Sequence, residues 1–165
     1  LARDLLAQAG YAEGFSTTLK LPPPSYARRG GEIIAAQLRE VGIEAEISFL
    51  EWAQWLEQVF RGYDYGLTIV SHTEPMDINI YARPDYYFQY DNPDFQELME
   101  TLAVESDPAA RSALLAQAQT TIAKDFVNGY LFQLALTSVV DAKLKGIWKD
   151  APTQAVDLTG VRWAD

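Results

Sequence analysis

The sequence predicts an α/β fold in which helices flank a largely parallel sheet, and two observations lead to it. Strand and helix patterns alternate through residues 17–70 in the order strand, helix, strand, helix, strand. Such βαβ units have right-handed crossovers, which place successive strands parallel in one layer. The length of 165 residues and the hydrophobic content of 48% are those of one ordinary globular domain with a buried core.

The first half of the chain contains the elements of this sheet. A helix is expected to end before Gly10, because glycine is favoured directly after a helix C-terminus. The first strand stops at Pro22, which cannot donate to a strand ladder. Residues 28–31, two arginines and two glycines, are expected to form a solvated, flexible entry to the next helix. The predicted elements are helices at 2–9, 32–41 and 51–60 and strands at 17–21, 43–49 and 65–70.

The second half begins with residues 71–91, which have no period and hold four of the nine tyrosines. Asn92 and Asp107 each precede a proline, the pattern of a helix N-cap followed by proline in the first turn. The predicted elements are helices at 94–104 and 108–125 and strands at 130–136 and 138–144, followed by a turn-rich segment at 150–165.

Two aromatic groups call for an interpretation. The first has helical spacing and is predicted to face the sheet as core; it comprises Trp52, Trp55, Val59 and Phe60. The second suits either a stacking wall for a ligand or the packing of a long loop onto the domain, because tyrosine combines apolar area with a polar tip in both uses. Both interpretations stay open for this second group, which comprises Tyr86, Tyr87, Phe88 and Tyr90.

Composition excludes several classes of function. The formal net charge of −10, with no basic cluster to offset it, disfavours nucleic-acid binding. The absence of cysteine removes disulfides, thiolate zinc sites and cysteine nucleophiles. No apolar run approaches the roughly 20 residues that a membrane-spanning helix needs. The sequence begins LARDLL, without an initiating methionine or a signal-peptide pattern, and we expect it to be a piece of a longer protein.

Polar side chains gather where the third predicted strand ends. The only histidine of the chain lies there, preceded by a serine and followed by a threonine and two acidic residues. Because ligands of open α/β sheets bind outside the carboxyl ends of the strands, this is a binding location by geometry alone. We expect the candidate residues to face a binding cleft; they are Ser71, His72, Thr73, Glu74 and Asp77.

Catalysis and metal binding are the alternatives for this segment, and both signals are weak. Ser71 and His72 are adjacent, so their side chains diverge on an extended backbone, and no GxSxG elbow is present. One imidazole with Glu74 and Asp77 is a sparse metal set, and no GxGxxG or Walker spacing occurs. The prediction is therefore no metal, no cofactor and no catalytic residue. The enzymatic alternative is a small hydrolase or lyase that uses His72 with Glu74 or Asp77.

Three blocks of the sequence carry a resemblance to a known family. They are "ARDLLAQAGYAEGF", "AAQLREVGIEAEISFLEWAQWLEQVFRGYDYGLTIVSH" and "YDNPDFQELMETLAVESDPAARSALLAQAQTTIAKD". In this order they resemble the extracellular solute-binding proteins of ABC importers, family 5, which bind dipeptides, oligopeptides or nickel. The resemblance covers nearly the whole chain.

The resemblance implies one lobe of a two-lobed, type II periplasmic-binding-protein fold. Residues 1–137 would form most of the second lobe, and residues 138–165 would return to the first lobe. It implies a non-enzymatic protein in the periplasm or outside the cytoplasmic membrane. Its partners would be a small solute, peptide-like or another small polar molecule, and the membrane permease subunits that receive it.

At one position the sequence departs from the family. Peptide-binding members carry an aspartate after this strand, and it pairs with the terminal ammonium of the peptide; alignment on Glu74 and Pro75 places Ser71 there. A neutral hydroxyl cannot offset a buried ammonium. Recognition of a free peptide N-terminus therefore stays open. Because the isolated piece would expose surface that the other lobe covers, self-association is also expected.

Overall fold

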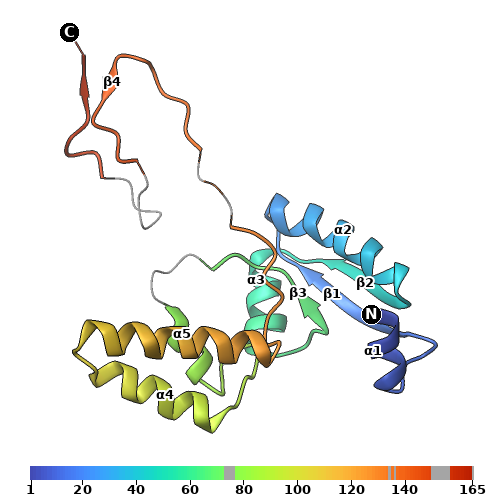
Figure 1. Ribbon diagram of the computed structural model, residues 1–165. Helices are drawn as coiled ribbons and strands as arrows, with labels where there is room; N and C mark the ends of the chain where they lie inside the picture. Colours follow the sequence, from blue (N-terminus) through green and yellow to red (C-terminus); the bar gives the residue numbers. More distant parts are fainter. Residues whose placement is uncertain (73–76, 134, 136, 150–156, 165) are drawn as a thin grey trace. The chain divides into compact units, whose positions relative to one another are not determined.

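The computed structural model describes residues 1–72, 77–133, 135, 137–149 and 157–164. The chain divides into two compact units. The first contains residues 1–72 together with 85–89, and the second contains residues 73–84 and 90–165. Figure 1 shows the elements of both units, which are described separately below.

A three-stranded parallel sheet forms the centre of the first unit. It comprises β1 (Phe15–Leu21), β2 (Ile43–Phe49) and β3 (Leu67–Thr68), in the order β2-β1-β3. β1 and β2 pair over their full lengths, but β3 contributes only two residues to the ladder. The α/β prediction with a parallel sheet is confirmed, and the third strand is shorter than the predicted 65–70.

The helices of the first unit are α1 (Ala2–Gln8), α2 (Ser25–Glu40) and α3 (Trp52–Trp55), which continues as the π-helical turn η1 (Leu56–Arg61). α2 begins seven residues before the predicted start at 32, so the expectation of a loop at residues 28–31 is wrong. The reason is packing: Gly31 is buried against the Leu21 side chain of β1, and the absence of a Cβ allows this close approach.

Two hydrophobic clusters stabilise the first unit. One lies between the sheet and α2 and contains Leu19, Leu21, Ala35 and Ala45. The other contains Leu50, Trp55, Val59 and Tyr87. The predicted core role is thus confirmed for Trp55 and Val59, and Phe60 packs against them partly buried. The prediction is wrong for Trp52, which is 41% exposed at the start of the short helix.

The second cluster also resolves the interpretation left open for the aromatic segment. Tyr87 is buried within it, with Tyr86 and Phe88 packed beside it. Its neighbour Tyr90 belongs to the second unit and packs against Phe95. For these residues, packing of a long loop onto the domain is the observed arrangement.

The second unit contains the two long helices predicted from their capping residues. They are α4 (Pro93–Val104) and α5 (Pro108–Lys124), preceded by the 3-10 helix η2 (Asp77–Ala82). The Asn92 side chain accepts a hydrogen bond from the Phe95 backbone N–H, and the Asp107 side chain accepts from the N–H groups of Ala109 and Ala110. Both predicted N-caps are confirmed. The buried residues of these helices are Phe95, Leu98, Leu102, Ala118 and Ile122.

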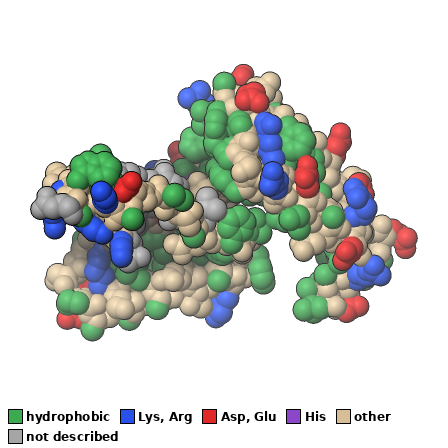
Figure 2. All heavy atoms as spheres, turned by 90° about the horizontal axis from the view of Figure 1, so that it is seen from above, with side chains coloured by type: hydrophobic (Ala, Val, Ile, Leu, Met, Phe, Trp, Pro, Cys, Tyr) green, Lys and Arg blue, Asp and Glu red, His purple; other side chains and the backbone are tan. Residues whose placement is uncertain are grey.

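After α5, the described residues do not form the two predicted strands. In the described part of residues 130–143 the chain forms no strand; the next elements are β4 (Leu144–Lys145) and β5 (Arg162–Trp163), which pair antiparallel. The predictions at 130–136 and 138–144 are therefore wrong. Apolar character alone does not make a strand without a partner, and Phe132 and Val139 are largely exposed. Exposed hydrophobic side chains are visible as green spheres in Figure 2.

Within the described ranges, no helix is both long and apolar enough to cross a membrane.

Candidate functional site

The candidate site begins where the chain leaves β3. The three strands are parallel, so their carboxyl ends meet at one edge of the sheet, at Leu21, Phe49 and Thr68 (Figure 1). Beyond Thr68 the chain stays half-buried for two residues and then becomes exposed at Ser71 and His72. The structure thus places these two predicted site residues at the edge where ligands of such sheets bind.

Tyr26 determines the backbone position of Ser71. The Ser71 backbone N–H donates a hydrogen bond to the Tyr26 hydroxyl at 2.9 Å. Tyr26 lies in the first turn of α2, directly after β1, so this contact ties the end of the third strand to the helix that follows the first. The sequence reasoning missed Tyr26; its place one turn after a strand end is the signal that could have identified it.

Tyr87 determines the position of His72. The Nε2 atom of His72 lies 3.0 Å from the Tyr87 hydroxyl, and the two ring planes differ by 1° with centroids 6.0 Å apart. The Tyr86 ring is also near, with its centroid 6.2 Å from that of the imidazole. An exposed imidazole is therefore held at the edge of a buried aromatic cluster.

A paired arginine lies near the same edge. Arg28 donates a hydrogen bond to the Glu51 carboxylate at 3.2 Å, and its guanidinium lies over the Phe49 ring, 5.2 Å from the centroid. Glu51 also caps α3 in a reciprocal capping box with Gln54. The positive charge at this edge is therefore balanced by a carboxylate of the same unit.

The remaining predicted residues are distributed differently. Thr73 and Glu74 lie outside the described residues. Asp77 is half-buried at the start of η2 and belongs to the second unit. The structure therefore brings Ser71 and His72 to one strand end and places Asp77 on a separate element.

A tyrosine anchors the helix that carries Asp77. Four residues on, the buried Tyr81 accepts a hydrogen bond from Asn128 at 2.7 Å and lies 3.1 Å from the Tyr130 hydroxyl. Burial, followed by the hydrogen bond with Tyr130, raises the pKa of Tyr81 well above its ordinary value. Tyr81 is thus a neutral anchor between η2 and the segment after α5.

No metal centre emerges from this arrangement. Across the part of the chain that the structure describes, no group of three or more His, Asp or Glu side chains could hold a metal ion. The only described carboxylate among the predicted residues is Asp77, since Glu74 falls outside that part.

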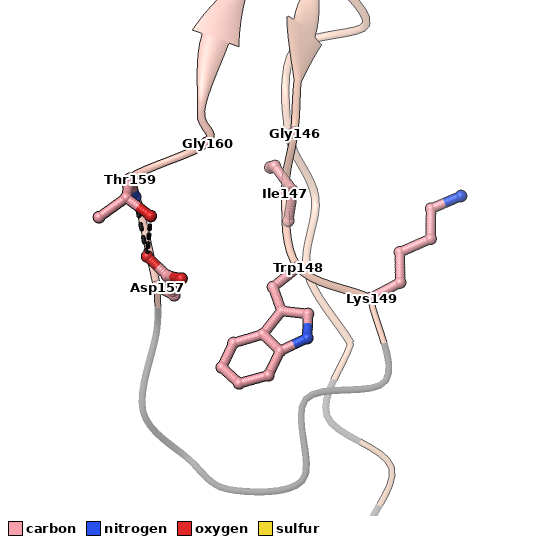
Figure 3. A pocket seen from close by; sticks show the side chains of 7 residues that line it. All are labelled: Gly146, Ile147, Trp148, Lys149, Asp157, Thr159 and Gly160. Carbon is pink, nitrogen blue, oxygen red and sulfur yellow. Dashed lines mark hydrogen bonds between the residues drawn. The ribbon is translucent and has the colours of Figure 1, made fainter.

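A hollow lies elsewhere, between the segment that follows β4 and the segment that precedes β5 (Figure 3). Its side chains do not converge on a common point: the Trp148 ring projects into the space between these two segments, while Lys149 points away from it. The Asp157 carboxylate accepts hydrogen bonds from the Thr159 hydroxyl and backbone N–H, and these bonds hold the pKa of Asp157 below its ordinary value. The carboxylate thus serves a local turn, and we place the candidate site at the sheet edge instead.

Comparison with known proteins connects this geometry to a class. No family model matches the sequence, and no curated protein sequence matches it. Solved structures do match. The periplasmic binding protein DppA of Helicobacter pylori, associated with an ABC transporter and bound to the peptide STSA, is 25% identical, with a TM-score of 0.66 over 76% of this chain and 27% of that one.

Two further structures match nearly the whole chain. A dipeptide-binding protein of Pseudoalteromonas sp. SM9913, in complex with Met-Leu, is 21% identical, with a TM-score of 0.72 over 98% of this chain and 34% of that one. The oligopeptide-binding protein AppA of Bacillus subtilis, in complex with a nonapeptide, is 20% identical, with a TM-score of 0.72 over 99% of this chain and 37% of that one.

The fold is therefore α/β and similar to the type II periplasmic-binding-protein fold. The chain spans about a third of the length of these structures. The three neighbours are binding proteins rather than enzymes.

Proposed function

We propose that this chain is part of an extracytoplasmic solute-binding protein that captures a small solute, peptide-like or another small polar molecule, and delivers it to an ABC-transporter permease. The observation that carries the proposal is the fold likeness to dipeptide- and oligopeptide-binding proteins over 98–99% of the chain. The candidate residues support it, since the described Ser71 and His72 lie at the edge where this class of sheet binds ligands.

The proposal extends to the division of the chain. Residues 1–137 would form most of one lobe, and residues 138–165 would dock on another lobe supplied by further sequence. Two observations support this: the chain spans about a third of the matched structures, and apolar side chains such as Val139 and Trp148 are exposed. Surface of that kind is normally covered by a partner.

The solute would meet one wall of a cleft at Ser71, His72, Thr73, Glu74 and Asp77. In place of the family's aspartate, Ser71 offers a hydroxyl, which stabilises an ammonium less than a carboxylate does. We therefore expect solutes that do not depend on a free peptide N-terminus to bind better than those that do. Phe49 and Trp52, both exposed, are apolar surface of the same unit.

Identifying the retained solute tests the proposal. The full-length protein that contains this chain is purified and its bound small molecules are identified by mass, and Met-Leu and STSA are then titrated by calorimetry. Stoichiometric binding with the solute recovered unchanged is expected. Turnover of the solute that stops in His72→Ala would instead support the hydrolase or lyase alternative.

A further inference from the structure

Tyr87, the neighbour of His72, is anchored in the interior of the first unit. Its side chain is buried in the cluster with Leu50, Trp55 and Val59. The Trp55 and Tyr87 ring centroids are 5.7 Å apart in an edge-on contact. The Tyr87 carbonyl oxygen also accepts a hydrogen bond from the Tyr65 hydroxyl at 2.8 Å. Both the ring and the backbone of Tyr87 are therefore determined by the interior of the first unit.

From this position Tyr87 presents its hydroxyl to an exposed imidazole. The distance to His72 Nε2 is 3.0 Å, within the range of a hydrogen bond. The two ring planes are parallel to within 1°, with centroids 6.0 Å apart. The contact thus places the Tyr87 hydroxyl within hydrogen-bond distance of Nε2, with the two rings held parallel.

The chemistry of the two groups selects the direction of this bond. A phenol O–H is a stronger acid than the N–H of a neutral imidazole, so the hydroxyl is the better donor and the ring nitrogen the better acceptor. A neutral imidazole carries one proton, and when Nε2 accepts, that proton is on Nδ1.

We propose that Tyr87 is a positioning residue that orients His72 and holds it as the Nδ1–H tautomer. The imidazole edge opposite Tyr87 is then a hydrogen-bond donor, suited to a carbonyl or carboxylate oxygen of the solute. This role rests on the proposed function, because it takes His72 as part of the solute site. It specifies in addition that the group of the solute that His72 recognises is a hydrogen-bond acceptor.

The single histidine of the chain makes the tautomer directly measurable. The protein is labelled with ¹⁵N-histidine, and the ring nitrogen shifts are recorded without solute at alkaline pH, where the imidazole is neutral. The wild type is expected to show the Nδ1–H form. In Tyr87→Phe, which keeps the buried ring and removes only the hydroxyl, the signal should move toward the Nε2–H form that predominates for imidazole in water.

Tyr63→Phe is the matched control. It removes a hydroxyl that donates a hydrogen bond to the Asp85 carbonyl oxygen at 2.7 Å. Asp85 is in the same segment as Tyr87, but this hydrogen bond does not involve His72. The tautomer should be unchanged there. A wild type in the Nε2–H form, or a Tyr87→Phe variant with an unaltered tautomer, would overturn the assignment.

Binding of Met-Leu provides the second measurement, made on the full-length protein. An asparagine amide reaches the position of Nδ1, whereas a glutamine amide reaches that of Nε2. His72→Asn should therefore retain affinity better than His72→Gln, and Tyr87→Phe should lose about tenfold, the equivalent of one ordinary hydrogen bond. The reverse order of Asn and Gln contradicts the donor role of Nδ1. Failure of every protein to bind Met-Leu counts against a peptide solute, and the tautomer experiment still decides the role of Tyr87.

Discussion

The Trp55 indole donates a hydrogen bond to the Thr68 hydroxyl at 3.0 Å. That hydroxyl in turn donates to the Lys20 carbonyl oxygen of β1 at 2.7 Å. β3 pairs with β1 over only two residues, so this side-chain connection adds to a short ladder. It joins α3 to the strand whose carboxyl end leads to Ser71 and His72. One buried tryptophan thus stabilises both the core and the strand that positions the candidate site.

Replacing Trp55 by alanine is expected to destabilise the protein strongly. The side chain is 4% exposed, and removal of a buried tryptophan typically costs about 3–5 kcal/mol. The free energy of unfolding is measured by denaturant titration. Trp52→Ala is the control, because its side chain is 41% exposed, and we expect it to cost less than half as much. A loss below about 1 kcal/mol for Trp55→Ala would show that the residue is not core and would reopen a ligand role.

Two adjacent glycines of α2 should respond to alanine in opposite directions. A Cβ on Gly30 meets no atom within 4 Å, so Gly30→Ala should stabilise the helix by about 0.5–1 kcal/mol. A Cβ on Gly31 would overlap the fully buried Leu21 side chain, so Gly31→Ala should destabilise by about 1–3 kcal/mol. Thermal unfolding of the two variants compares them. Equal effects would mean that α2 does not pack on β1 through Gly31.

The regular part of the fold could be predicted because its signals are local. The alternation at residues 43–49 and the caps at Asn92 and Asp107 specify their elements without reference to distant residues. The start of α2 could not be predicted in this way, since two glycines disfavour a helix locally. The helix through this stretch depends on the packing of Gly31 against Leu21 of the preceding strand, which is a tertiary contact.

The candidate site could be located but not constructed from the sequence. The end of a predicted parallel strand identified the edge that contains Ser71 and His72. The partner Tyr26 could have been found from its place after the first strand, but Tyr87 could not be deduced, because it lies on a segment brought to that edge by tertiary packing. The role of the other predicted residues stays a prediction, with Thr73 and Glu74 outside the described part of the chain.

A tyrosine of the second unit should make stability fall in alkali. Burial, followed by the hydrogen bond to Asp125, raises the pKa of Tyr90 to about 12, above its ordinary value near 10. Below about pH 10 the phenol is neutral in both the folded and the unfolded state, so its contribution to stability is fully present. As pH rises from about 10 through about 12, the unfolded state loses the proton first, and that stability is lost.

Phenolate absorbance measures this effect. Because the chain has nine tyrosines, the Tyr90 titration is taken as the difference between the wild type and Tyr90→Phe. In Asp125→Asn the pKa of Tyr90 should fall part of the way toward its ordinary value, since burial remains. A difference curve centred at the ordinary value in the wild type would contradict the contact with Asp125.

Ser71→Asp should convert the site toward recognition of an ammonium. The family resemblance of the sequence implies, in peptide-binding members, a carboxylate at this position that pairs with the peptide N-terminus, and a hydrogen bond to a charged group contributes about 1.5–3 kcal/mol. Affinity for Met-Leu is therefore expected to rise by about tenfold or more in the full-length protein. N-acetyl-Met-Leu is the control for calorimetry, and it should gain nothing. An equal gain for both dipeptides would show that the new carboxylate does not meet the amino group.

The isolated chain is expected to self-associate through the segment after α5. Phe132 and Val139 are 61% and 102% exposed, and further apolar side chains of that segment are exposed beside them. Contiguous exposed apolar surface favours association, while the net charge of −10 opposes it and is screened by salt. Sedimentation should therefore show a mass that rises with protein concentration and with salt. The double variant Phe132→Ser and Val139→Ser should lower association, whereas Val104→Ser, which changes an apolar residue 83% exposed at the end of α4, should not. A chain that stays monomeric at high concentration and high salt would show that this segment needs no covering partner, and the proposed docking of residues 138–165 would lose its support.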